Sequence, residues 1–87
     1  MAQILLFGYG FDGCIIEHKY PTEKVFVNAD TKFVRYGAVK PELTPGVNRF
    51  EVCTQRIGED TFVYAVNRTT QPDEIYQSIH RFRPDPL

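Results

Sequence analysis

Tryptophan is absent from this chain of 87 residues, and cysteine and methionine are scarce, with two copies and one copy. Two cysteines, Cys14 and Cys53, are too few for the disulfide framework of a small secreted domain. No apolar run approaches the roughly 18 residues of a membrane span. The short run Ile4–Phe7 is preceded by no basic region, as a signal peptide would require. We therefore expect a cytoplasmic protein with no membrane partner.

The sequence also lacks the patterns that support catalysis or hold a metal. His18 and His80 are far apart and lie in no ligand-spaced motif, whereas a metal site needs several converging ligands. Cys14 and His18 would lie roughly 13 Å apart along one strand, too far for a thiol and its base. Glu59 and Asp60 are neighbours in a predicted turn, and no serine nucleophile motif or phosphate loop is present. We expect no enzymatic activity, no cofactor and no metal.

Neither sign of charge dominates the chain. Ten Lys and Arg residues face eleven Asp and Glu residues, so the net charge is −1. Neutralisation of phosphates dominates the affinity of nucleic-acid-binding proteins, and this balance argues against such a partner. The basic residues are also spread along the sequence rather than gathered in a run. A protein partner is therefore favoured over a nucleic acid.

What the chain does have is a segment, Phe7 to Cys14, that fits three motifs at once. Three glycines spell the G-x-G-x-x-G pattern of dinucleotide-binding loops: Gly8, Gly10 and Gly13. The middle of the segment, Gly8–Phe11, matches part of an RNA-recognition motif, but Phe7 stands where that motif needs a basic residue. Asp12-Gly13 is a typical two-residue β-hairpin turn.

The dinucleotide interpretation requires a helix between two parallel strands. Asp30 lies 22 residues after Gly8, near the roughly 20-residue spacing of a ribose-binding acid. The helix would have to end before Pro21, which leaves Cys14–Tyr20, about 10 Å of helix. A parallel strand of about 20 Å would need a longer crossover. A nucleotide-binding domain is therefore kept only as a second alternative.

The hairpin interpretation explains more residues. Type I′ turns need positive φ at both central positions, which favours Asp-Gly. Pairing Phe11 with Cys14 would place Tyr9 opposite Ile16, Phe7 opposite His18 and Leu5 opposite Tyr20. Alternation then puts these residues on one apolar, aromatic face and leaves a mixed opposite face: Ile4, Leu6, Gly8, Gly10, Ile15, Glu17 and Lys19. We predict an antiparallel hairpin with one buried face.

Two more hairpins and one helix are predicted downstream. Lys24–Asn28 and Lys32–Tyr36 should pair across residues 29–31, and Arg49–Ile57 and Thr61–Asn67 across residues 58–60. The helix has the expected signals, which are a capping Thr70, Pro72 in the first turn, and a buried stripe of Ile75, Ile79 and Phe82.

The predicted fold is a single α+β domain over residues 1–83, followed by an extended tail at residues 84–87. Its mainly antiparallel sheet should have five or six strands built from hairpins, with the C-terminal helix packed on one face.

Because no catalytic pattern is present, we predict a small protein-binding module. A virus-encoded inhibitor or regulator of a larger host protein is one example, suggested by size and class rather than by particular residues. The first alternative is a single-stranded nucleic-acid-binding protein that uses an aromatic and basic sheet face. The sequence predicts no oligomeric state.

The predicted partner-binding surface is the stretch from Tyr36 to Asn48. It is longer than a hairpin connection, and long loops in compact domains are often functional. Pro41 and Pro45 would limit its freedom before binding and so lower the cost of ordering it. We predict that it binds the partner together with Arg35, Tyr36, Lys40 and Arg49.

Overall fold

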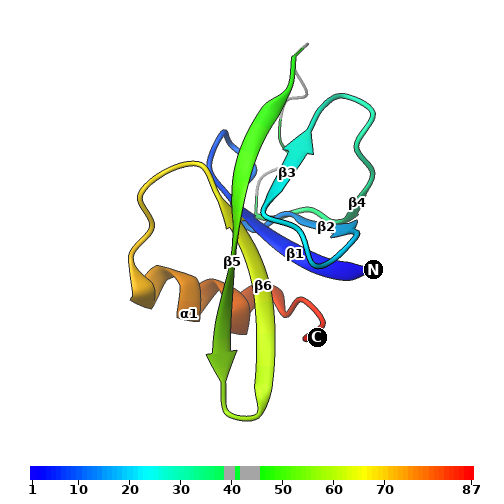
Figure 1. The fold of residues 1–87 in the computed structure, drawn as a ribbon. Coiled ribbons are helices and arrows are strands. Elements are labelled where there is room, and N and C mark those ends of the chain that lie inside the picture. The colour runs from blue at the N-terminus through cyan, green and yellow to red at the C-terminus, as the bar shows by residue number, and fades with distance from the viewer. Residues whose placement is uncertain (39–40, 42–45) are drawn as a thin grey trace.

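The computed structural model describes residues 1–38, 41 and 46–87 (Figure 1). Within them the chain forms six strands and then a helix: β1 (Ala2–Phe7), β2 (Ile15–His18), β3 (Lys24–Val27), β4 (Phe33–Arg35), β5 (Asn48–Ile57), β6 (Asp60–Val66) and α1 (Pro72–Phe82). The order across the sheet is β3-β5-β6-β1-β2-β4. β1 and β6 are parallel, and the other neighbouring strands are antiparallel. The α+β prediction, a mainly antiparallel sheet with one C-terminal helix, is confirmed.

Strand β1 lies inside the sheet and is buried on both faces. It pairs with β2 on one side and with β6 on the other. Ile4 and Leu6 point to one cluster of buried residues, while Leu5 and Phe7 point to a second cluster on the opposite face. A strand covered on both faces reads as a continuous apolar run rather than an alternating one, which is what Ile4–Phe7 shows.

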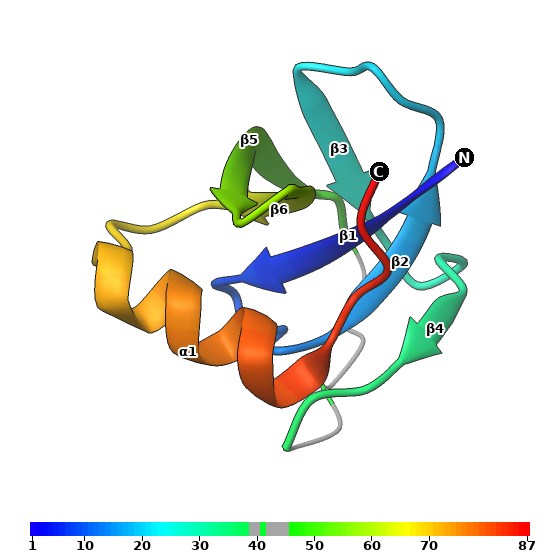
Figure 2. The ribbon, with the colours of Figure 1, turned by 90° about the horizontal axis from the view of Figure 1, so that it is seen from below.

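The two clusters divide the interior. The first, the sheet core, gathers Val25 and Val27 of β3 and Phe50 of β5, with Phe33 of β4 packed against it. Because both edge strands contribute to this cluster, the sheet curls around it. The second, the helix core, lies between the other sheet face and α1. In Figure 2, β3 and α1 lie on opposite sides of β1.

Helix α1 begins and ends for identifiable reasons. Pro72 occupies the first turn, where its missing N–H costs nothing, and Asp73 and Glu74 complement the positive end of the helix dipole. Ile75 and Ile79 are buried in the helix core, as predicted. The predicted cap is wrong. Gln71 precedes the helix with no side-chain hydrogen bond, since the Thr70 hydroxyl donates to Arg68 O at 3.1 Å instead.

The first predicted hairpin has the right strands and the wrong register. β1 and β2 are antiparallel, and φ at Gly13 is 83°, as expected. However, Leu5 pairs with Ile15 and Ile4 pairs with Ile16. Because β1 ends at Phe7 and β2 begins at Ile15, the connection is longer than two residues. The predicted faces are therefore wrong as well. Both faces of β1 are buried, and the helix that the dinucleotide interpretation needs after Gly13 is replaced by β2.

The second predicted hairpin is wrong and the third is confirmed. β3 and β4 lie at opposite edges of the sheet, because β3 pairs with β5 and β4 pairs with β2. β5 and β6 form the expected hairpin, with Ile57 paired to Asp60 across the tight turn at Gly58-Glu59. Gly58 has a φ of 63°, which explains why glycine suits that turn.

The C-terminal tail folds back along the sheet. Asp85 N–H donates to the side chain of Gln3 at 2.8 Å, and Leu87 N–H donates to Thr61 O at 2.8 Å. These bonds tie residues beyond α1 to both β1 and β6.

Candidate functional site

The connection from β1 to β2, residues 8–14, is called the glycine loop below. It is anchored at its base by Leu6 N–H, which donates to Cys14 O at 2.9 Å. The backbone φ is 115° at Gly8, 52° at Tyr9 and 79° at Gly10, so three successive residues have positive φ. This path leaves the sheet and presents Tyr9 to solvent, where 57% of it is exposed.

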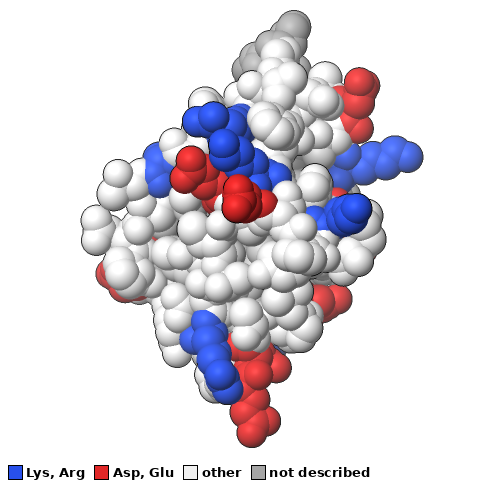
Figure 3. Space-filling view, in the orientation of Figure 1, with Lys and Arg blue, Asp and Glu red and all other residues white. Residues whose placement is uncertain are grey.

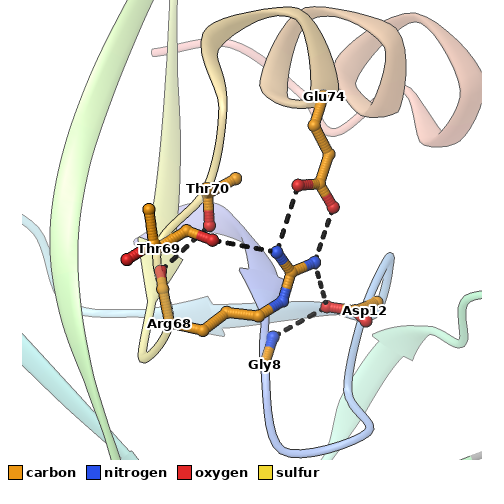
Figure 4. A network of polar contacts seen from close by, with 6 residues as sticks. All are labelled: Gly8, Asp12, Arg68, Thr69, Thr70 and Glu74. Carbon is orange, nitrogen blue, oxygen red and sulfur yellow. Dashed lines mark hydrogen bonds and ion pairs between the residues drawn. The ribbon is translucent and has the colours of Figure 1, made fainter.

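A polar network joins the glycine loop to the start of α1 (Figure 4). Gly8 N–H donates to Asp12 Oδ1 at 2.7 Å, and the same oxygen accepts a bond from Arg68 Nη2 at 3.1 Å. The Arg68 guanidinium also forms two hydrogen bonds with the carboxylate of Glu74. The arginine therefore bridges two acids that come from the loop and the helix.

The electrostatics of the network follow from these bonds. The hydrogen bonds to Arg68 hold the pKa of Glu74 below its ordinary value. The same contact with Glu74, with a smaller contribution from Asp12, raises the pKa of Arg68. All three side chains are partly exposed, so solvent screens each pair, and the network derives its strength from one guanidinium serving two carboxylates.

The Asp12 carboxylate accepts hydrogen bonds from the kinds of donor that hold an anion in a phosphate-binding loop. In such a loop, backbone N–H groups near the glycines and a nearby basic residue hold phosphate oxygens. Here the Gly8 N–H and Arg68 both donate to the Asp12 carboxylate. The glycine loop is thus closed on a carboxylate of its own chain, which weakens the case for a bound nucleotide.

A polar pocket of about 530 Å³ lies between the glycine loop and the neighbouring ends of β5 and β6. That volume is within the range of small-ligand sites, roughly 300–1,000 Å³. Most of its lining is polar or charged: Tyr9, Arg49, Glu51, Asn67, Arg68 and Thr69. The pocket thus combines an exposed aromatic ring with an arginine from the sheet.

The register of β3 and β5 extends this surface beyond the pocket. Phe26 lies opposite Arg49, and Lys24 lies opposite Glu51, so these four side chains share one sheet face. Phe26 is 56% exposed, which is unusual for phenylalanine. We call the surface formed by Tyr9, Lys24, Phe26, Arg49 and Glu51 the Tyr9–Arg49 face. Figure 3 shows basic and acidic side chains side by side over the first half of β5.

The ring of Tyr9 is held as well as exposed. It meets Phe50 edge to face, with ring centroids 5.6 Å apart and an interplanar angle of 83°. Phe50 is fully buried and belongs to the sheet core. The exposed tyrosine therefore rests on a rigid part of the molecule.

The structure separates the residues predicted as the partner-binding surface. Arg35 donates to Arg83 O at 2.7 Å, just beyond the end of α1. Tyr36 is 45% exposed and its ring lies 5.2 Å from that of Phe33. Arg49 lines the pocket together with residues that precede α1. Lys40 lies outside the described residues, as do Pro45 and residues 39 and 42–44 of the predicted loop. Arg35 and Arg49 thus lie toward opposite ends of the helix.

Sequence reasoning missed Tyr9 and Phe26 as surface residues. A signal for Phe26 was available, because alternation in β3 places Val25 and Val27 on one face and Phe26 beside Lys24 on the other. For Tyr9, the flanking glycines indicate a turn with positive φ rather than a strand. The link between Asp12 and Arg68 had no signal, since it joins distant parts of the chain.

The described part of the chain also bears on metal binding, thiol reactivity and membrane crossing. Among residues 1–38, 41 and 46–87, no cluster of three or more His, Cys, Asp or Glu side chains could hold a metal ion. Cys14 is buried, and burial raises the pKa of its thiol. Over the same residues no helix has the length and apolar character needed to cross a membrane.

Comparison of the chain with protein-family models, with curated proteins and with solved structures gave no match in any of the three.

Proposed function

We propose that this protein is a non-enzymatic protein-binding module whose contact surface is the Tyr9–Arg49 face. The observation that carries the proposal is the conformation of Tyr9. A bulky residue with φ near 52° is uncommon outside glycine-like positions, and holding one there costs of the order of 1–3 kcal/mol. Residues held in such conformations cluster at ligand clamps and other functional sites.

The surroundings of Tyr9 favour recognition over a structural role. Its ring gains one aromatic contact with Phe50, yet more than half of the residue stays in water at 57% exposure. A residue kept only for packing would be buried. A tyrosine supplies a large contact area with little side-chain entropy to lose, and tyrosine and arginine are enriched in the energetic centres of interfaces. Arg49 lines the pocket together with Tyr9, and the exposed Phe26 lies opposite Arg49 on β3.

Charge favours a protein over a nucleic acid as the partner. The Tyr9–Arg49 face and the adjoining Arg68 network hold equal numbers of basic and acidic residues: Lys24, Arg49 and Arg68 against Asp12, Glu51 and Glu74. A groove for single-stranded nucleic acid needs an excess of cations beside its aromatic side chains. The single-stranded nucleic-acid alternative predicts salt-sensitive retention of oligonucleotides, whereas the proposal predicts none at physiological salt.

A quantitative capture experiment tests the proposal. The tagged 87-residue chain would be incubated with extract of its source cells, and retained proteins compared by mass spectrometry between the parent and its variants. Tyr9→Ala and Phe26→Ser should each deplete the same partner. Tyr76→Ala, on the outer side of α1 where the residue is 44% exposed, is the matched control and should retain it.

Two outcomes of that experiment would contradict this choice of contact surface. Equal capture by the parent and by both surface variants would refute the Tyr9–Arg49 face as the contact. Loss of capture with Tyr36→Ala alone would support the predicted loop instead. The narrower prediction, a virus-encoded inhibitor or regulator of a host protein, concerns the source and the partner and stays a prediction.

A further inference from the structure

We propose that the pocket beside Tyr9 receives one carboxylate of the protein partner, an Asp or Glu side chain, on the guanidinium of Arg49. The inference rests on the proposed protein-binding function and names the chemistry of the partner segment as acidic.

The first support is that no described acid forms an ion pair with Arg49, although Glu51 lies on the same face of β5. Among the described residues its guanidinium forms no hydrogen bond or ion pair, unlike those of Arg68 and Arg35. Its cross-strand neighbour is Phe26, which is apolar, whereas Glu51 lies opposite Lys24. The register therefore places a cation directly opposite Glu51 and a phenyl ring directly opposite Arg49.

The second support is the shape and lining of the pocket. Arg49 lines a hollow of about 530 Å³ rather than projecting from a convex surface. The other lining residues with potential donors are Tyr9, Asn67 and Thr69. A planar guanidinium can hold a carboxylate through two parallel hydrogen bonds, which adds direction to the contact. Apolar groups of the incoming side chain would meet the ring of Tyr9.

The third support distinguishes a carboxylate from a phosphate. Arg68 lines the same pocket, but Asp12 and Glu74 already occupy its guanidinium. Glu51 adds a negative charge to the lining. A dianion would meet one available arginine and three acids, whereas a monoanion needs only that one arginine. The charge balance therefore selects a single carboxylate.

Titration of the intact chain, followed by two-dimensional ¹⁵N NMR, tests the inference. The probe is N-acetyl-aspartate α-amide, which has one carboxylate, and its matched neutral control is N-acetyl-asparagine α-amide. We expect saturable shifts at millimolar probe for the amides of Tyr9, Arg49, Asn67 and Thr69 and for the side-chain Nε–H of Arg49. The neutral control should leave these signals unchanged.

Variants assign the effect to Arg49. Arg49→Gln should weaken probe binding about tenfold or more, because it removes both the charge and the paired donors. Arg49→Lys should retain part of the binding as a point charge. Arg56→Gln, at the far end of the same strand, is the control and should bind as the parent does. The amide spectrum of each variant would establish that it is folded.

Three results would overturn the inference. They are the absence of saturable shifts at the pocket, equal binding of the neutral control, and tighter binding of inorganic phosphate than of the carboxylate probe at the same residues. The proposed function fails separately. Capture that is lost with Tyr9→Ala but unchanged with Arg49→Gln would uphold the protein-binding face and reject the carboxylate contact. Probe binding without any captured partner would uphold the carboxylate contact and reject the protein-binding face.

Discussion

Arg68 Nη2 lies 3.1 Å from Asp12 Oδ1, which joins the end of β6 to the glycine loop across 56 positions of sequence. The same carboxylate oxygen accepts the Gly8 N–H, and the same arginine reaches Glu74 in the first turn of α1. This pairing fixes the loop against both the sheet and the helix. It therefore acts together with the ring contact to Phe50 to hold Tyr9 in place.

Replacing Asp12 should loosen the loop. Asp12→Ala removes the acceptor for the Gly8 N–H and one partner of Arg68, so we expect a loss of about 1–2 kcal/mol in the free energy of unfolding. Asp12→Asn keeps an acceptor oxygen and loses only the charge, so its cost should be smaller, near ~0.5 kcal/mol for a partly exposed pair. Urea unfolding of the three proteins gives the comparison. Equal midpoints for all three would mean that the loop is held by other contacts.

The network also predicts a pH dependence. Because Arg68 lowers the pKa of Glu74 in the folded state, Glu74 contributes stability above its ordinary pKa. That contribution is lost as the pH falls through the lowered value, below roughly pH 4. Glu74→Gln should therefore flatten the fall in melting temperature between neutral and acidic pH. Glu59→Gln, in the exposed β5–β6 turn, is the control, and a matching change in both variants would contradict the assignment to Arg68.

Gly13 should tolerate no side chain. Its φ is 83°, and a Cβ added there would lie 2.5 Å from Cζ of Phe82. Gly13→Ala therefore combines an unfavourable backbone conformation with a clash against α1, and we expect a cost of about 2–3 kcal/mol. Gly10 has a similar φ of 79°, but no atom lies within 4 Å of the position that an added methyl group would take, so Gly10→Ala should cost only about 1 kcal/mol. Chemical denaturation would show the difference, and the reverse order would exclude the contact with Phe82.

Ile79 should be essential to the docking of α1. It is 3% exposed and belongs to the helix core with Leu5 and Phe7. Ile79→Ala should destabilise the protein by roughly 2–4 kcal/mol, since the cavity can close only in part. Urea midpoints for the variant and parent measure the effect. An unchanged midpoint would mean that the helix contributes little to folding of the isolated chain.

Local signals in the sequence predicted the elements that depend on neighbouring residues. The helix followed from Pro72, its acidic first turn and the spacing of Ile75 and Ile79. The β5–β6 hairpin followed from alternation on both sides of Gly58, where the turn is tight and local. Both the helix and the hairpin depend on residues that are close in sequence, and both predictions agree with the structure.

Errors arose where distant segments decide the pairing. Val25 and Val27 are both fully buried, and they are buried because β3 pairs with β5 rather than with β4. Alternation indicates which side chains of β3 are buried, but it cannot indicate which strand β3 pairs with. The parallel pairing of β1 with β6 also joins opposite halves of the chain. It uses the edge of β1 that faces away from β2.

The candidate site was hard to predict for the same reason. The chain folds so that Tyr9, Arg49 and Arg68 line one pocket, although they lie in three separate segments. Arg49 was predicted as a contact residue because it flanks the long loop, and the structure places it in the pocket instead of beside Arg35. Long-range packing, rather than motif spacing, assembles this surface.

The affinity of Tyr9→Gly for the captured partner tests the central claim most directly. Glycine adopts a φ of 52° without strain, so relief of about 1 kcal/mol should offset the lost ring contact with Phe50, worth about 0.5–1.5 kcal/mol. The variant should therefore melt close to the parent while isothermal titration calorimetry shows binding weakened about tenfold or more, as expected for an interface anchor. An unchanged dissociation constant in a protein of unchanged stability would contradict the claim that Tyr9 is displayed to bind a partner.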